Sequence, residues 1–160
     1  MMPFMGANKK IELKAEMGKS IITNRNDLVI KVTMTNSMNK QLLIHKYVDF
    51  LYDFDSDAEF YFEVEKYQNN NYSKVDGCAN YQTVPRFDSL GNVLDYVLDT
   101  LPVGASTTHE YNITRLFCIT KGKYRTRLVY NILPINKIKQ KVVWSNWLYF
   151  DVIPDYINPY

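Results

Sequence analysis

The residues best suited to metal chemistry form a short acidic run. Asp53, Asp55 and Asp57 have the D-x-D-x-D spacing with which calcium-binding loops begin. An EF-hand loop also needs a glycine at its sixth position and a glutamate at its twelfth, where this sequence has Ala58 and Val64. The EF-hand interpretation therefore fails. We expect a solvated hairpin tip here, with a looser calcium site at the tip of a β-sandwich as the alternative.

The histidine, cysteine and serine residues form no recognisable catalytic pattern. His45 and His109 lie far apart, which excludes an H-E-x-x-H metal site, and no serine lies in a G-x-S-x-G elbow. Cys118 follows Phe117 in an apolar stretch, which is typical of an inert thiol or a disulfide partner. A Cys–His nucleophile pair is the remaining catalytic alternative. The sequence thus predicts that the protein is not an enzyme and holds no cofactor or metal.

The two cysteines, Cys78 and Cys118, allow two different states. In an oxidising compartment they can form one disulfide, which would stabilise the fold by about 3–4 kcal/mol on the chain-entropy model. In a reducing compartment they remain separate thiols. The residues themselves do not decide between these states.

The aromatic residues give the strongest indication of function. The chain has 13 tyrosines, and aromatic residues make up 14% of it. Exposed Tyr and Trp mark recognition surfaces, although the same residues could fill a core that is short of Leu and Ile. We predict a partner-binding surface on a hairpin at residues 47–67 and a loop at residues 68–86. Its predicted contact residues are Tyr52, Tyr67, Tyr72, Tyr81 and Arg86.

Alternating apolar and polar residues predict the strands that must position this surface. In residues 28–36, Leu28, Ile30, Val32 and Met34 fall on one face of an extended chain. The same alternation predicts strands at residues 9–17, 41–44, 60–67, 106–113, 123–131 and 142–152.

Three segments carry less regular patterns. Residues 90–101 also satisfy helical spacing, but the strand context and the following Pro-Val-Gly turn favour an extended segment. Residues 53–59 predict an acidic hairpin tip. Residues 68–86 predict a long loop with one short extended piece, because an asparagine run, Gly77 and Pro85 break the alternation.

Composition bounds the class of protein. Of the 160 residues, 46% are hydrophobic and 22% are charged, which is typical of a globular domain. The net charge of +2 is scattered, with no basic stripe, so nucleic acid is not an expected partner. No stretch reaches the ~18 apolar residues of a transmembrane helix. The first residues lack the pattern of an export signal, which indicates either a cytoplasmic protein or a signal that was removed.

These patterns predict the fold class. Short strands separated by turns, without βα units, favour an all-β antiparallel sandwich of about 7–9 strands, of the Ig-like or fibronectin-III-like kind. We expect one domain at residues 9–153, a loosely attached or disordered N-terminus at residues 1–8, and a C-terminal tail at residues 154–160.

Several motifs resemble those of a known class of domains. The motifs are LVIKVTMTN at residues 28–36, PVGAS at 102–106, YNI at 111–113, KGKYR at 121–125 and SNW at 145–147. They resemble the Ig-like β-sandwich of uncharacterised exported bacterial proteins and are more distantly similar to intracellular proteinase-inhibitor-type sandwiches. The resemblance covers residues 28–36 and 102–152 and implies structural roles for Asn36, Gly122, Tyr124 and Trp147. Tyr124 is placed for a tyrosine corner, with its ring in the core and its hydroxyl bonded to the backbone. Gly122 would permit a tight turn with positive φ.

The expected function combines the resemblance with the aromatic residues. We expect a non-catalytic interaction module of the bacterial cell envelope, periplasmic or on the cell surface, that recognises a protein or glycan partner. A cytoplasmic location is the alternative. The alternative function is an inhibitor or immunity protein that blocks the active site of a protease or toxin with the loop at residues 68–86. The patterns do not predict an oligomeric state.

Overall fold

A computed structural model describes residues 10–45, 60–78 and 98–159. The part that it describes contains strands and three short 3₁₀ turns but no α-helix, so the predicted all-β class is confirmed. The strands are β1 (Ile11–Met17), β2 (Ile21–Ile22), β3 (Val29–Asn36), β4 (Leu42–His45), β5 (Phe60–Gln68), β6 (Asn71–Lys74), β7 (Leu98–Leu101), β8 (Ser106–Asn112), β9 (Thr120–Asn131), β10 (Val142–Trp144) and β11 (Leu148–Tyr156). The 3₁₀ turns are η2 (Arg25–Asp27), η4 (Ile113–Arg115) and η5 (Pro134–Asn136).

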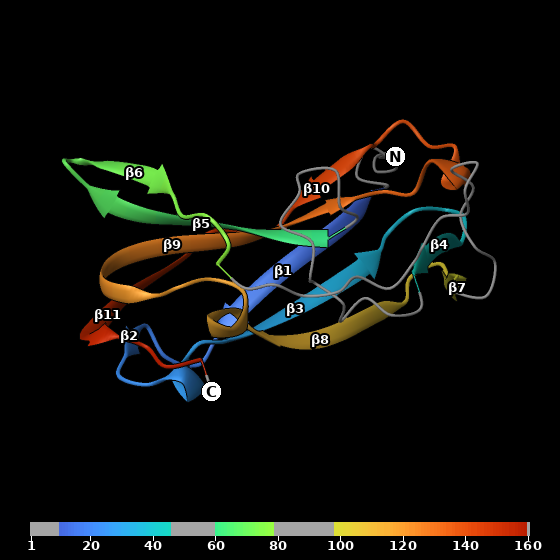
Figure 1. Ribbon diagram of the computed structural model, residues 1–160. Coiled ribbons are helices and arrows are strands. Elements are labelled where there is room, and N and C mark those ends of the chain that lie inside the picture. Colours follow the sequence, from blue (N-terminus) through green and yellow to red (C-terminus); the bar gives the residue numbers. More distant parts are fainter. Residues whose placement is uncertain (1–9, 46–59, 79–97, 160) are drawn as a thin grey trace, which may run out of the picture.

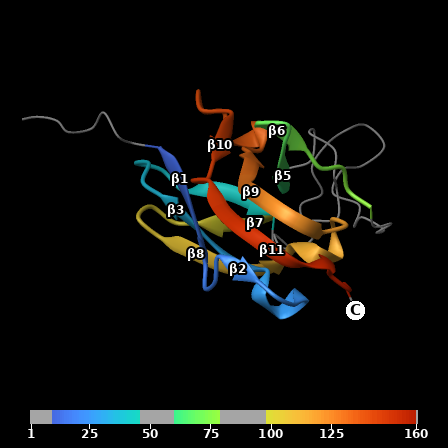
Figure 2. The same cartoon turned by 90° about the vertical axis from the view of Figure 1, so that its left-hand side faces the viewer.

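The strands form two main layers (Figures 1 and 2). One layer is a three-stranded sheet in the order β1-β3-β8. The other is a six-stranded sheet in the order β2-β11-β9-β5-β6, in which β10 also pairs with β9. Strands β4 and β7 form a separate pair. All pairings are antiparallel except that of β2 with β11.

Hydrophobic alternation explains how the layers meet. In β1 the side chains of Ile11, Leu13 and Ala15 are buried, and in β3 those of Ile30, Val32 and Met34 are buried. Apolar side chains of this size contribute roughly 1.5–3 kcal/mol each when fully buried. The two sheets share one buried cluster, as a sandwich-like arrangement requires.

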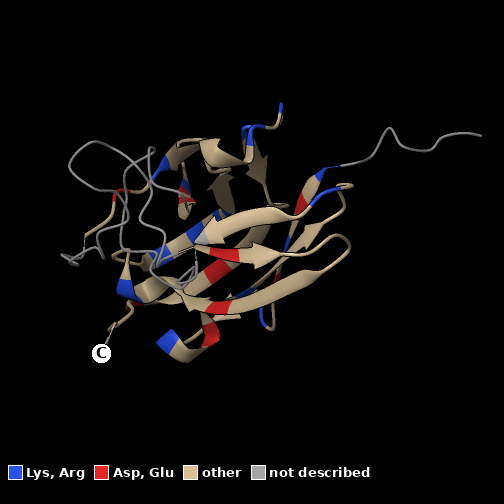
Figure 3. Ribbon diagram, turned by 90° about the vertical axis from the view of Figure 1, so that its right-hand side faces the viewer, with Lys and Arg blue, Asp and Glu red and all other residues tan. Residues whose placement is uncertain are grey.

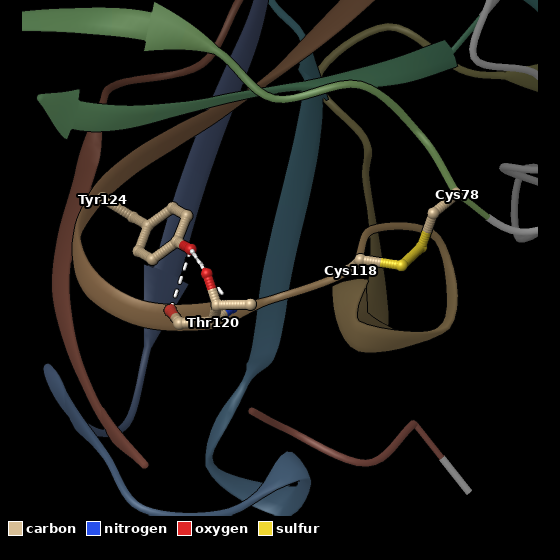
Figure 4. The surroundings of a disulfide bond; sticks show 4 residues. All are labelled: Cys78, Cys118, Thr120 and Tyr124. Atoms are coloured by element: carbon tan, nitrogen blue, oxygen red, sulfur yellow. Dashed lines mark hydrogen bonds between the residues drawn. A yellow bond between two sulfur atoms is a disulfide. The ribbon is translucent and has the colours of Figure 1, made fainter. Parts of the chain in front are cut away.

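The N-terminal half of β9 carries the tyrosine that the motifs single out. The Tyr124 ring is 1% exposed and stacks on Phe150 with 5.3 Å between ring centroids. The Tyr124 hydroxyl donates a hydrogen bond to the Thr120 carbonyl oxygen at 2.8 Å (Figure 4). Gly122 has a φ of 151°, but it lies inside β9 opposite Val152 rather than in the predicted tight turn. There its missing side chain leaves room for Lys66, whose Nζ reaches Thr120 Oγ1 at 2.9 Å.

Asn36 joins four segments at the end of β3. Its side chain is fully buried, and Nδ2 donates to the carbonyl oxygens of Lys40 and Leu101 at 3.0 and 2.9 Å. Its Oδ1 accepts from the Met38 N–H at 3.0 Å. Its main chain bonds to Gly104 and Ala105 in the turn between β7 and β8. Every polar atom of this buried side chain is therefore satisfied.

The segment at residues 68–86 is not a loop at its beginning. Asn69 and Asn70 both have positive φ, 53° and 64°, which is the backbone of a two-residue type I′ turn. Asparagine tolerates this conformation, so the run that seemed to break the pattern instead closes the β5–β6 hairpin. Beyond β6, residues 75–77 form a strap: the Val75 N–H bonds to the Val64 carbonyl oxygen at 2.8 Å, and Gly77 bridges Phe117.

A disulfide joins Cys78 to Cys118 and so decides between the two cysteine states (Figure 4). It closes a separation of 40 residues and ties the strap to the connection between η4 and β9. The Cys78 N–H also donates to the Leu116 carbonyl oxygen at 3.1 Å. Since Cys118 is bonded in this way, it is not a free thiol that could pair with a histidine as a nucleophile.

The predicted strand at residues 142–152 is interrupted. β10 ends at Trp144 and β11 begins at Leu148, and the register against β9 shifts by one residue between them. Asn146 and Trp147 consequently both lie opposite Arg127, which is the arrangement of a β-bulge. Ser145 bridges the interruption, because its Oγ accepts the Leu128 N–H at 2.9 Å.

The bulge also closes an open sheet edge. Asn146 bonds both main-chain groups of Ala15 through its amide, at 2.8 and 3.0 Å, and Gln140 does the same for Ile11, at 2.9 and 3.2 Å. The two amides take the place of a neighbouring strand along β1. They join the sheets and block one edge to unwanted pairing.

The remaining predictions fall partly outside the described residues. β7 is extended as predicted, whereas residues 90–97, the hairpin tip at 53–59 and the segment 1–8 lie outside the description. At the C-terminus, β11 runs on to Tyr156 and Ile157 is buried, so residues 154–157 belong to the sheet and core rather than to a tail.

Candidate binding face on the six-stranded sheet

The outer face of the six-stranded sheet carries a stack of aromatic rings and arginines. Along β9, Arg125 and Arg127 point away from the core, because they alternate with the buried residues Tyr124, Thr126 and Leu128. The bulge turns Trp147 onto the same outer face as Trp144. Together with Tyr72 from β6, these side chains form what we call the aromatic–arginine ladder: Trp144, Arg127, Trp147, Arg125 and Tyr72.

The contacts within the ladder are close. The guanidinium carbon of Arg125 lies 4.3 Å from the ring centroid of Tyr72 and 4.2 Å from that of Trp147. That of Arg127 lies 4.3 Å from Trp147 and 5.7 Å from Trp144. Trp147 is thus shared by both arginines. Cation–π contacts at exposed sites contribute about 0.5–1 kcal/mol each, so the ladder orders its own side chains.

Two glutamates on β5 neutralise the arginines. Glu65 and Glu63 lie directly across from Arg125 and Arg127, with closest nitrogen–oxygen distances of 2.6 and 2.7 Å. Burial alone would lower the pKa of Arg125, but its hydrogen bonds to Glu65 and Tyr149 outweigh that effect and raise the pKa. Each of the two arginines is thus paired with one glutamate, so the two pairs together carry no net formal charge. Figure 3 shows acidic and basic residues interspersed on the strands in view.

Three aromatic side chains on this face are open to solvent. Tyr149 is 55% exposed, Trp144 51% and Tyr67 42%. The ring centroid of Tyr72 lies 5.2 Å from that of Tyr67 and 6.3 Å from that of Tyr149, so the three tyrosines continue the ladder. Large apolar side chains this exposed, held in a contiguous row, are typical of an interaction surface.

A groove adjoins the ladder between β5 and the strap. Its volume is about 400 Å³, and its walls include Glu63 and Arg127 on one side and Val75, Asp76 and Gly77 on the other. The strap is held at both ends, by the Val75 main chain and by the disulfide at Cys78. The groove wall therefore does not depend on a loose loop.

The structure brings together some of the predicted contact residues and adds others. Tyr67 and Tyr72 lie on the β5–β6 hairpin and belong to this face, although on strands rather than in a loop. Tyr52, Tyr81 and Arg86 lie outside the described residues. The residues that the prediction missed are Glu63, Glu65, Arg125, Arg127, Trp144 and Tyr149. The available signal was that both glutamates and both arginines fall on the polar face of their own strands.

Within residues 10–45, 60–78 and 98–159, no group of three His, Cys, Asp or Glu residues could hold a metal ion. None of the helical turns in that same part of the chain is long and apolar enough to cross a bilayer.

Comparisons with known proteins add no identification. No protein-family model matches the chain, and no curated protein matches it either.

Proposed function

We propose that the protein is a non-catalytic binding module of the bacterial cell envelope, with an Ig-like β-sandwich fold, that recognises a protein or glycan partner. The observation that carries the proposal is the row of half-exposed aromatic side chains on the outer face, Tyr67, Trp144 and Tyr149. These three side chains lie on strands, next to the ordered side chains of the ladder. A surface that is already ordered loses little conformational entropy when a partner binds.

The order of the strands supports the Ig-like part of the proposal. If β1, β3 and β8 are given the letters A, B and E, and β11, β9, β5 and β6 the letters G, F, C and C′, the two sheets follow the variable-type arrangement. Tyr124 stands near the start of the strand that would be F, with its hydroxyl bonded four residues upstream, as in a tyrosine corner.

The residue types on the face support recognition over a purely structural role. Trp, Tyr and Arg are the residues most enriched among interface hot spots. Because each arginine already has a glutamate partner, a partner molecule covering the face would not leave an unpaired buried charge.

The envelope location rests on two kinds of support. Disulfides persist in oxidising compartments such as the periplasm, and the Cys78–Cys118 bridge is compatible with one. The resemblance of the sequence motifs to exported bacterial domains points in the same direction.

A matched pair of tyrosines tests the binding face. Tyr149 and Tyr156 are 55% and 54% exposed and both lie on β11, but only Tyr149 adjoins the ladder. Immobilised wild type, Tyr149→Ala and Tyr156→Ala would be incubated with a solubilised envelope fraction and with purified cell-wall glycan. We expect Tyr149→Ala to lose the bound component and Tyr156→Ala to keep it. Equal retention by both variants would contradict the proposal.

An inhibitor or immunity protein is the second candidate, and the bracing of the strap favours it. The described part of the predicted loop, residues 68–78, begins with a hairpin and is fixed at Cys78. An inhibitory surface that is ordered before binding binds at a lower entropic cost. Stoichiometric inhibition of a co-encoded protease or toxin would support this candidate. Binding of an envelope component without inhibition of any such enzyme would reject it.

A further inference from the structure

The groove beside the ladder has a composition that points to one class of ligand. Its polar side chains are Glu63, Glu65 and Arg127 from the sheet and Lys74 and Asp76 from the hairpin and strap. The described part of the chain offers no hydrogen-bond or ion-pair partner to Lys74 or Asp76. Both side chains are exposed, so the groove presents an ammonium and a carboxylate that remain available.

The paired residues keep unused atoms as well. Glu65 accepts from Arg125 through Oε1 alone, and Glu63 accepts from Arg127 through Oε2 alone, which leaves one carboxylate oxygen on each without a partner among the described residues. Arg127 uses only Nε in its ion pair, so its two terminal nitrogens keep their donors. The groove therefore offers both donors and acceptors.

The formal charge of the lining is nearly balanced. Three carboxylates face two cationic groups, so the groove strongly favours neither an anion nor a cation. A hydroxyl group both donates and accepts, and adjacent hydroxyls can span a carboxylate and a guanidinium. The partly buried Val75 adds apolar surface to the same groove. A volume of about 400 Å³ lies within the range of small-molecule sites, which is ~300–1,000 Å³.

From these observations we infer that the groove between β5 and the strap is a binding subsite for a neutral saccharide. The inference rests on the proposed function and specifies its partner as a glycan. The hydroxyls of a sugar ring bind the oxygens of Glu63 and Asp76 and the donors of Arg127 and Lys74. The apolar face of the sugar covers Val75. The exposed rings of the ladder then contact neighbouring units of the glycan.

The test uses the full chain, labelled with ¹⁵N, and a panel of neutral mono- and disaccharides: glucose, galactose, mannose, N-acetylglucosamine, maltose and cellobiose. We expect at least one of these sugars to shift the amide signals of Glu63, Asp76 and Gly77. Asp76→Asn and Lys74→Ala should each weaken that binding about tenfold, since each removes a hydrogen bond to a charged group. Asp155→Asn, which changes another exposed carboxylate outside the groove, should leave the affinity unchanged.

Other results would overturn the inference. The inference fails if no sugar shifts any amide signal at millimolar concentration, or if the shifts fall elsewhere on the molecule. It also fails if an acidic or basic peptide displaces the sugars. The proposed function can be separated from this outcome. If the groove variants still capture an envelope partner and Tyr149→Ala does not, the binding face stands and the saccharide subsite is rejected. If Tyr149→Ala also retains capture, the proposed function itself fails.

Discussion

At the scale of single residues, Trp144 at the end of β10 and Trp147 in the bulge have different roles. Trp147 contacts both guanidinium groups and is half-buried, whereas Trp144 is 51% exposed and contacts one arginine loosely. The two side chains are identical, but Trp147 organises the ladder and Trp144 presents a ring to solvent. Their different contacts allow stability and recognition to be separated by substitution.

Substitution of each tryptophan tests this division. Trp147→Ala should lower the free energy of unfolding by about 2–3 kcal/mol, because it removes two cation–π contacts and part of a covered ring. Trp144→Ala should lower it by less than about 1 kcal/mol, while weakening capture of the partner. Urea unfolding curves measure the difference. Equal destabilisation by both variants would show that the ladder does not depend on Trp147.

Asp27 gives a prediction for acid stability. The N–H of Thr23, followed by the Thr23 hydroxyl and Lys19, lowers the pKa of Asp27 from 3.8 to about 2, although desolvation opposes this shift. A carboxyl whose pKa is lower in the folded state stabilises the fold above its unfolded pKa, and this stabilisation disappears as the pH falls from about 4 to about 2. The midpoint temperature of thermal unfolding should therefore fall more steeply across that pH interval for the wild type than for Asp27→Asn. Parallel curves for the two proteins would contradict the assignment.

At the scale of elements, Gly122 in β9 leaves space for the side chain of Lys66 from the neighbouring strand β5. Its φ of 151° is unfavourable for any other residue, and a Cβ there would lie 2.6 Å from Lys66 Cε. The space is used by Lys66 on its way to Thr120 and over the Tyr124 ring, 5.5 Å from its centroid. The glycine thus allows β5 and β9 to pack closely at this point.

Two glycine substitutions compare this position with an unconstrained one. Gly122→Ala should lower the free energy of unfolding by about 1–3 kcal/mol, mainly through backbone strain. Gly18→Ala has no atom within 4 Å of its new methyl group and no positive φ, so it should change stability little. Chemical denaturation of both variants provides the comparison. A harmless Gly122→Ala would show that the φ of this residue is not required.

Strands with a clear alternation of apolar and polar residues could be predicted from the sequence. Features that depend on the register between two strands could not. β1 and β3 follow from strict alternation, because each buries one face only. Alternation predicts one continuous strand at residues 142–152 and gives no sign of the break at Asn146–Trp147, since a one-residue bulge leaves the composition of the strand unchanged. For residues 68–86 the sequence predicts a long loop with one short extended piece, because the asparagine run breaks the alternation. In the structure Asn69 and Asn70 instead form a type I′ turn that leads directly into β6. The ladder depends on the register of β9 with both β5 and β10. This register cannot be predicted from the sequence of any one strand.

At the scale of the whole molecule, covalent and polar cross-connections hold the two layers and their loops. The amides of Gln140 and Asn146 join β1 to the other sheet, Asn36 ties β3 to β7, and the disulfide fixes the strap. Each connection links segments that are distant in the sequence. They limit the motion of the binding face relative to the core.

The disulfide should contribute to global stability. Replacing both Cys78 and Cys118 by Ala, or reducing the wild type, should lower the free energy of unfolding by about 3–4 kcal/mol, because a loop of 40 residues gains freedom in the unfolded state. Denaturation with and without a reductant measures the loss, and the double variant should not respond to the reductant. An unchanged midpoint on reduction would mean that the bridge contributes nothing to stability.

The central claim is that the outer face of the six-stranded sheet meets the partner. A photo-crosslinking amino acid at position 149, and separately at position 156, would report on it directly when each labelled protein is irradiated with a solubilised bacterial envelope fraction. We predict a specific crosslinked product from position 149 and none from position 156. A product from position 156, with none from position 149, would contradict the claim and place the partner elsewhere on the molecule.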